Sequence, residues 1–261
     1  MPELPDVEGF RRLLHARAVG QTIIAVDIAD PGVVRNRSAP DFARNLAGRR
    51  FAEPDRRGKW LLAPTDGPTI LFHFGMTGSL RWDDADGEDR RFDRIVIRFG
   101  NEKLVYQDQR KLRGVWLADD EDAVTAVIGE QGPDALGLSA RRLEERLEDH
   151  RGALKPVLMD QRVLAGLGNM LSDEVLWQAR IHPARRFGDL DPSERRKLSR
   201  TLQRALQTSA RAGSIPRRPT WLSSQRSLPD PTCPRCHAEL ATSRIGGRTS
   251  YWCPVCQPPG V

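Results

Sequence analysis

The sequence lacks any long apolar run. None approaches the roughly 20 residues that a membrane-spanning helix needs. The N-terminal segment, MPELPDVE, is acidic and no hydrophobic stretch follows it, so we expect no secretory signal peptide. We therefore expect a cytoplasmic protein with no membrane partner.

Lysine is also scarce, because the 41 basic side chains are nearly all arginines. The planar guanidinium of arginine suits bidentate contacts with phosphate, but it cannot act as an amine nucleophile. Schiff-base chemistry would therefore have few lysine candidates. They are Lys59, Lys103, Lys111, Lys155 and Lys197.

Positive charge is present in excess and is unevenly distributed. The net charge is +6 overall, −2 over residues 1–130 and +8 over residues 131–261. The stretch 195–248 holds 12 basic and only two acidic side chains. A basic half indicates a polyanionic partner, usually a nucleic acid, although a solvated basic face is the alternative interpretation.

The pattern of apolar residues changes near residue 130. Upstream, short β-type segments alternate with turns, and we expect strands at 22–29, 59–64, 69–74, 94–99 and 103–107. Downstream the spacing is helical, and we expect helices at 139–150, 154–164, 169–180 and 191–212, besides an opening helix at 2–19. Residues 213–231 hold four of the 19 prolines and are expected to form a loop. The pattern predicts an α+β protein.

All four cysteines lie in the last 29 residues, as two CxxC pairs separated by sixteen residues. This spacing is typical of a zinc ribbon, in which four thiolates surround one structural Zn²⁺. Two disulfides are the alternative, but a cytosolic protein is kept reduced. The pairs are Cys233 with Cys236 and Cys253 with Cys256.

A catalytic zinc site is a second alternative, because His237 and Glu239 match the H-x-E of nucleobase deaminases. Trp252 stands where that signature has proline, and the first cysteine pair would have no role. Only 22 residues follow Glu239, too few for the rest of such a domain.

Residues 159–183 read as two amphipathic helices around the turn Ala-Gly-Leu-Gly-Asn. Asn169 stands where the second helix begins, and unpaired N–H groups there would form a phosphate site. Helical hairpins that bind nothing are commoner, so the pattern alone leaves both interpretations open.

Pro2 becomes the N-terminal residue once the initiator methionine is removed. An α-amine has a pKa of about 8, so much of it is unprotonated near neutral pH. Such an amine can attack an electrophilic carbon and leave an iminium, and the adjacent Glu3 is placed to transfer protons. The alternative is that Pro2 merely begins a helix.

Four segments, PELPDVE, HFGMTGSLR, MDQRVLAGLGN and GGRTSYWCPVCQ, together resemble the formamidopyrimidine-DNA glycosylase / endonuclease VIII family. The resemblance extends over essentially the whole chain, and the PELP start favours the formamidopyrimidine branch. It implies an N-terminal β-sandwich flanked by helices, then a helix–two-turn–helix domain with a zinc finger. We expect these domains at 1–130, 131–220 and 221–261.

The resemblance implies a monomeric, nucleoid-associated enzyme of base excision repair that binds double-stranded DNA containing damaged bases or abasic sites. Such an enzyme excises oxidised bases, here 8-oxoguanine and formamidopyrimidines, through a Schiff base on the N-terminal proline. It then cleaves the strand as an abasic-site lyase by β,δ-elimination. The zinc, one ion per chain, is structural.

Family roles match individual positions of this sequence. Pro2 would attack C1′ of the flipped nucleotide, Glu3 would assist ring opening, and Lys59 would hold a phosphate by the lesion. The remaining matches are DNA contacts. Asn169 and Arg248 would bind phosphates, Met76 would fill the gap in the base stack, and Arg110 and Leu112 would face the orphaned base. Lys155 matches a DNA-binding lysine of the helical domain, and Glu174 matches an acidic position there.

Several positions depart from the family pattern. Asp6 replaces a glutamate, Leu112 replaces a phenylalanine in a segment with one extra residue, and Leu171 replaces a tyrosine. Residues 213–231, where the lesion-covering loop would fall, match nothing assignable. These departures motivate a rival hypothesis from another class: a catalytically altered zinc-finger paralogue that recognises damaged or abasic DNA without excising a base.

Overall fold

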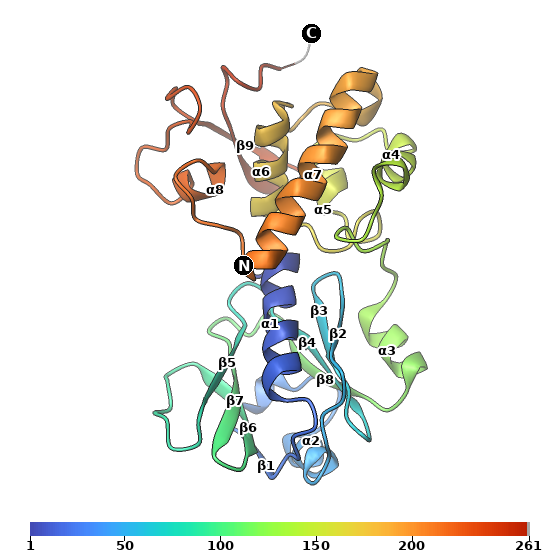
Figure 1. The fold of residues 1–261 in the computed structure, drawn as a ribbon, viewed down its shortest axis with the longest axis vertical. Coiled ribbons are helices and arrows are strands. Elements are labelled where there is room, and N and C mark those ends of the chain that lie inside the picture. The colour runs from blue at the N-terminus through green and yellow to red at the C-terminus, as the bar shows by residue number, and fades with distance from the viewer. Residues whose placement is uncertain (260–261) are drawn as a thin grey trace. The chain divides into compact units, whose positions relative to one another are not determined.

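The computed structural model describes residues 1–259 (Figure 1). The chain divides into two compact units. The first contains residues 1–2 and 6–130, and the second contains residues 3–5 and the chain from residue 131 onward. Within the described part of the chain, no helix is both long and apolar enough to cross a membrane.

The first unit is built on two four-stranded antiparallel sheets, with strand orders β1-β6-β7-β5 and β2-β3-β4-β8. Three helices and one 3₁₀ turn accompany them. The elements are α1 (Leu4–Arg17), β1 (Ala25–Ile28), η1 (Pro31–Val33), α2 (Ala39–Leu46), β2 (Asp55–Arg57), β3 (Trp60–Ala63), β4 (Thr69–His73), β5 (Ser79–Asp84), β6 (Asp93–Phe99), β7 (Glu102–Gln107), β8 (Gly114–Ala118) and α3 (Glu121–Ile128).

Alternation along strands β3 and β4 explains how the sheets pack. Leu61 and Phe72 belong to the large apolar cluster that also holds residues of β6 and β7. Leu62 and Leu71, which alternate with them, pack instead with Val124 of α3. Successive side chains of a strand point to opposite faces. The second sheet is therefore covered by the first sheet on one face and by α3 on the other, which confirms the expected sandwich flanked by helices.

The second unit is helical and ends in a two-stranded hairpin. Its main core joins apolar residues of α4 to α7, and a smaller cluster includes Cys233 and Cys253. The elements are α4 (Ala140–Glu148), α5 (Leu154–Met159), α6 (Asn169–Ala179), η2 (Phe187–Asp189), α7 (Pro192–Ala212), α8 (Leu222–Gln225), β9 (Ala241–Ile245) and β10 (Arg248–Trp252).

Some sequence expectations of local structure are wrong. The helix expected at 154–164 ends at Met159, because the side-chain amide of Gln161 stabilises a turn. Its Nε2 donates to Met159 O and Leu167 O, and its Oε1 accepts from Gly166 N. The expected loop at 213–231 contains the short helix α8. In the first unit, strands β2, β5 and β8 and helices α2 and α3 lie where no particular element was expected.

Candidate functional site

The carboxylate of Glu3 closes the N-terminal end of α6. Oε2 accepts hydrogen bonds from the N–H of Gly168 at 2.7 Å and of Leu171 at 3.2 Å, and Oε1 accepts one from Met170 at 2.8 Å. A carboxylate is favoured there by the unpaired N–H groups and by the helix dipole. The expectation that these N–H groups are unpaired and await a phosphate is therefore wrong, because Glu3 uses them.

The turn before α6 lies so close to residues 3 and 4 that only glycine fits. A Cβ on Gly168 would lie 2.4 Å from Glu3 Cδ, and one on Gly166 would lie 2.3 Å from Leu4 Cδ1. Gly166 also has a φ of +119°, which L side chains rarely adopt. Leu4 N donates to Gly166 O at 3.0 Å. The two glycines are thus what allows the N-terminal segment to lie against α6.

A buried ion network lies within the same unit. Lys155 of α5 and Asp173 of α6 are almost fully buried, and Lys155 Nζ lies 2.7 Å from Asp173 Oδ1. Arg226, just after α8, contacts Asp173 Oδ2 at 3.0 Å, and Tyr251 N donates to the same oxygen at 3.1 Å. Burial lowers the pKa of Lys155 and raises that of Asp173, while their mutual attraction opposes both shifts. Two cations and an N–H group therefore stabilise one buried carboxylate.

The hairpin that carries Arg248 is attached to this network. Lys155 Nζ donates to Thr249 O at 3.1 Å and to Ser250 Oγ at 2.7 Å. Asn169 Nδ2 also donates to Thr249 O, at 3.1 Å. The Arg248 side chain itself is exposed. The structure thus brings Asn169, Lys155 and the backbone beside Arg248 together, although the ammonium group of Lys155 points into the protein.

Glu174, next to Asp173, attaches the short helix α8 to α6. It is fully buried, its Oε2 accepts from Ser223 N at 2.8 Å, and its Oε1 accepts from Gln178 Nε2 at 2.8 Å. Burial raises the pKa of Glu174. Asp173 and Arg226 were missed from the sequence. The available signal was the pair of adjacent acids in a segment whose other residues are mostly apolar.

In the first unit, three predicted residues lie on two neighbouring loops. Arg110 NH1 lies 2.9 Å from Met76 Sδ, and Met76 and Leu112 are exposed large apolar side chains. Asp108, which was not expected to matter, is buried and accepts from Thr77 Oγ1 at 2.6 Å and from Arg110 N at 3.1 Å. Asp108 therefore holds the two loops together.

Lys59 lies in the turn between β2 and β3, directly after Gly58, whose φ is +58°. Its side chain is partly exposed. Burial above all, and then the charges of Arg113 and Lys59, lower the pKa of His73 to about 4. His73 Nδ1 accepts from Gly75 N at 3.1 Å. The imidazole at the end of β4 is therefore neutral at pH 7.

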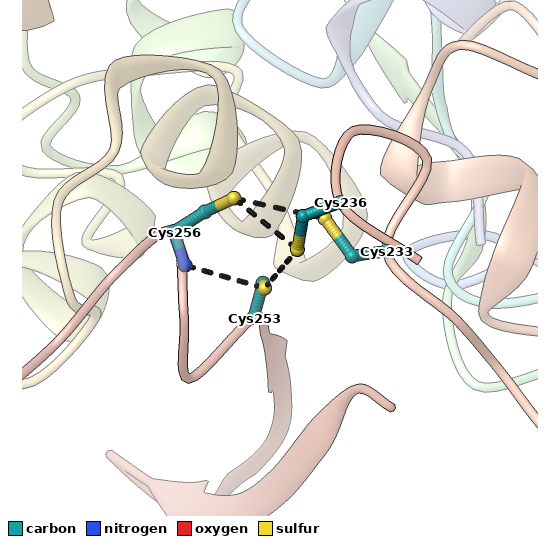
Figure 2. Close-up of side chains that lie close together, drawn as sticks. All are labelled: Cys233, Cys236, Cys253 and Cys256. Carbon is teal, nitrogen blue, oxygen red and sulfur yellow. Dashed lines mark hydrogen bonds between the residues drawn. The ribbon is translucent and has the colours of Figure 1, made fainter. Parts of the chain in front are cut away.

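The four cysteines converge on one point, as Figure 2 shows. Their Sγ atoms all lie within 4.8 Å of one another, with Cys236 3.4 Å from Cys253 and 3.6 Å from Cys256. A disulfide would need about 2.05 Å, so this is not the arrangement of two disulfides. The cluster can hold a metal ion, and His237 is not part of it.

Two family models match most of the chain. Residues 1–115 match the formamidopyrimidine-DNA glycosylase N-terminal domain, and residues 131–218 match the formamidopyrimidine-DNA glycosylase H2TH domain. The chain belongs to the formamidopyrimidine-DNA glycosylase family. The resemblance read from the four sequence segments is thereby confirmed, together with the fold class it implied.

Relatives of this family match over their full length. The formamidopyrimidine-DNA glycosylase of Pelotomaculum thermopropionicum is 32% identical over 98% of this chain and 99% of its own. That of Thermomicrobium roseum is 34% identical over 99% of each chain. Among solved structures, the Lactococcus lactis enzyme in complex with abasic-site DNA matches with a TM-score of 0.86 and 30% identity, over 99% of this chain and 100% of that one. The complex of the same enzyme with DNA containing an oxidised pyrimidine matches with a TM-score of 0.87 and 29% identity, over 99% of this chain and 100% of that one.

Replacing the buried Lys155 by methionine is expected to lower the free energy of unfolding by about 3–5 kcal/mol, because a buried carboxylate loses one of its two cations. Urea unfolding at pH 7 measures the change. The control is Arg141→Met, which removes an exposed pair with Glu145 and should cost less than about 1 kcal/mol. Equal losses in both variants would contradict a structural role for the buried pair.

The neutral His73 makes stability depend on pH. Its pKa is about 4 in the folded protein against 6.5 for the free side chain, so the unfolded chain binds the proton first as pH falls. Above pH 6.5 the shift has no effect on the free energy of unfolding. Between pH 6.5 and pH 4 the preferential protonation of the unfolded chain lowers that free energy by about 3 kcal/mol. Unfolding at pH 7 and pH 4 should therefore show a larger loss in the wild type than in His73→Gln. Parallel losses would disprove the shift.

Proposed function

We propose that this protein is a DNA glycosylase that removes oxidised bases from damaged double-stranded DNA and then cleaves the strand. The observation that carries the proposal is Glu3, held against the N-terminal end of α6 beside Asn169, in a chain that matches the family along its whole length. The Lactococcus lactis relatives bind DNA with abasic sites or damaged bases, which supports DNA of this kind as the substrate.

Pro2, freed by removal of Met1, supplies the nucleophile in this proposal. Its nitrogen forms a bond with C1′ of the flipped nucleotide while the bond from C1′ to the base breaks, and the base leaves with a proton. Glu3 accepts the proton that the amine loses and passes it to the ring oxygen, so that the sugar opens as the iminium forms. The iminium acidifies C2′, so successive β- and δ-eliminations release the 3′ and then the 5′ phosphate.

Charged and apolar side chains hold the extruded nucleotide. Flipping a base out of the duplex costs a few kcal/mol, which contacts in the complex must offset. Asn169, Arg248 and Lys59 bind phosphates in this proposal, and Met76 fills the gap in the stack. Lys155 acts indirectly, because its ammonium is used to hold the backbone beside Arg248.

The PELP start and the order of motifs, which resemble the formamidopyrimidine branch, support a preference for oxidised purines, and the loop that carries Arg110 and Leu112 bears on the opposite base. We infer that Arg110 donates to the orphaned base, with cytosine preferred, and that oxidised purines are released faster than oxidised pyrimidines. Leu112 offers apolar contact in place of aromatic stacking, which is worth about 1–3 kcal/mol per base. The preference for one opposite base is therefore expected to be weaker than with an aromatic residue.

The cysteine cluster fits zinc. A tetrahedron of thiolates with Zn–S bonds of about 2.3 Å places its sulfurs about 3.8 Å apart. Here the Sγ–Sγ distance is 3.9 Å between Cys233 and Cys256, 3.4 Å between Cys236 and Cys253, and 3.6 Å between Cys236 and Cys256. Bound zinc would supply structural cross-linking, because four thiolates leave no open position for water.

Reduction with borohydride over a duplex containing an abasic site is expected to give a stable protein–DNA adduct, because an iminium is trapped as an amine. Protein that retains Met1 should give no adduct although it binds the same duplex, since its Pro2 nitrogen is an amide. Tight binding by the processed protein without adduct or strand scission would favour the non-catalytic paralogue instead.

The same assay, run with 8-oxoguanine, formamidopyrimidine, thymine glycol and dihydrouracil opposite each of the four bases, tests lesion preference. The purine lesions opposite cytosine should react fastest. Faster release of the pyrimidine lesions would refute the assignment to oxidised purines without affecting the Schiff-base mechanism.

Removing one metal ligand should abolish metal binding and weaken DNA binding. Cys253→Ser is expected to lose the single zinc ion and to bind damaged duplex at least ten-fold more weakly, because the hairpin that carries Arg248 loses its cross-link. Val255→Ser, at an exposed position in the same CxxC turn, is the control and should retain both. Mass spectrometry measures the metal content and titration measures the affinity for DNA. Full DNA affinity in protein without metal would refute the structural role of the metal in DNA binding.

A further inference from the structure

A basic pocket of about 450 Å³ lies in the second unit and is formed mainly by α7. Four cationic side chains line it, and none of its lining residues is acidic. None of the roles assigned above uses it. The cations are Arg196, Lys197, Arg200 and Arg204, and the polar residues Gln178, Ser193 and Thr201 complete the lining.

The four cations of this pocket are exposed, and no hydrogen bond or ion pair engages their side chains within the part of the chain that the structure describes. Three arginines near them in the sequence or on neighbouring elements do have carboxylate partners. Arg185 pairs with Glu194, Arg195 pairs with Glu148, and Arg226 pairs with Asp173. The four cations of α7 therefore lack the carboxylate partners that these three arginines have.

Further positive charge surrounds the pocket. Burial, and then the charges of Arg180 and Arg235, lower the pKa of Lys197, and the opposing influence of Glu194 is smaller. The Arg235 guanidinium lies 4.4 Å from the centroid of the Trp177 ring. Like charges gathered without counter-ions create a local potential that attracts anions.

The spacing of the cations indicates an extended ligand. Arg196, Arg200 and Arg204 follow one another at four-residue intervals, so they form a row about 12 Å long on one face of the helix. The arginine fork suits phosphate oxygens. No aromatic side chain lines the pocket to stack on a base. A row of phosphates fits these features better than a single ion or a nucleobase.

We propose that this pocket is a second nucleic-acid site, which binds the phosphodiester backbone of a DNA segment other than the one held near Glu3. Helix α6 separates the two places. Asn169 begins α6 and Gln178 lies nine residues further on, about 14 Å along the axis. Contacts to phosphate alone carry no sequence information, so this site binds undamaged DNA in a salt-dependent way.

The test uses two variants with the same change in charge. The α7 variant is Arg196→Gln/Arg200→Gln/Arg204→Gln. The control is Arg141→Gln/Arg142→Gln/Arg151→Gln, at exposed arginines on and just after α4. Glutamine is a good helix former, so both proteins should fold, as circular dichroism will show.

Each protein is first saturated with a short unlabelled duplex that carries a stable abasic-site analogue, and is then titrated with a fluorescent undamaged duplex. The wild type and the control should bind this second duplex. The α7 variant should bind it at least ten-fold more weakly, with the slope of log affinity against log salt reduced by about 2–3, near 0.9 for each lost phosphate contact.

Three results would overturn the proposal: no second duplex on the saturated wild type, equal weakening in both variants, or weakening of the first duplex alone in the α7 variant. The last would mean that the pocket extends a single footprint. Excision from a short damaged duplex should be the same in all three proteins. If no protein excises a base, the proposed function fails, whereas the comparison of variants with the labelled duplex alone still tests the pocket.

Discussion

The three hydrogen bonds from the α6 N-terminus to Glu3 are the contact around which the second unit is organised. They bring together two segments more than 160 residues apart in the sequence and satisfy backbone groups that would otherwise be buried without partners. The contact requires glycine at positions 166 and 168, because a side chain at either place would displace Leu4 or Glu3. It also means that the N-terminal N–H groups of helix α6 are bound by protein.

The middle of α6 carries the next layer of organisation. Asp173 and Glu174 are two buried acids that point to different partners: the first contacts Lys155, Arg226 and β10, and the second contacts the start of α8. Toward the end of the helix, Trp177 Nε1 lies 3.4 Å from Cys233 Sγ. One helix of eleven residues therefore connects the N-terminal segment, the hairpin and the cysteine cluster.

Sequence patterns predicted what depends on local spacing and left out what depends on distant partners. The CxxC pairs, the alternating strands and the capped helix α7, whose Asp191 forms a capping box with Glu194, follow from neighbouring residues. The end of α5 does not, because it depends on the amide of Gln161 bonding across a turn. Asp173 and Arg226 were missed because an ion pair between residues 53 positions apart leaves no periodic signal. Residue roles matched to the family stay predictions.

The contact between Glu3 and the glycine turn bears on the entropy of the chain end. A free N-terminus is ordinarily among the most mobile points of a protein. Here residue 3 is fixed by its side chain and residue 4 by its N–H bond to Gly166, and the ring of Pro2 fixes the φ torsion of the residue before them. If Met1 is removed as proposed, only the φ torsion of residue 3 and the ψ torsion of Pro2 remain between the fixed side chain and the terminal nitrogen. In the proposed reaction, folding would thus raise the effective concentration of that nitrogen before any substrate is bound.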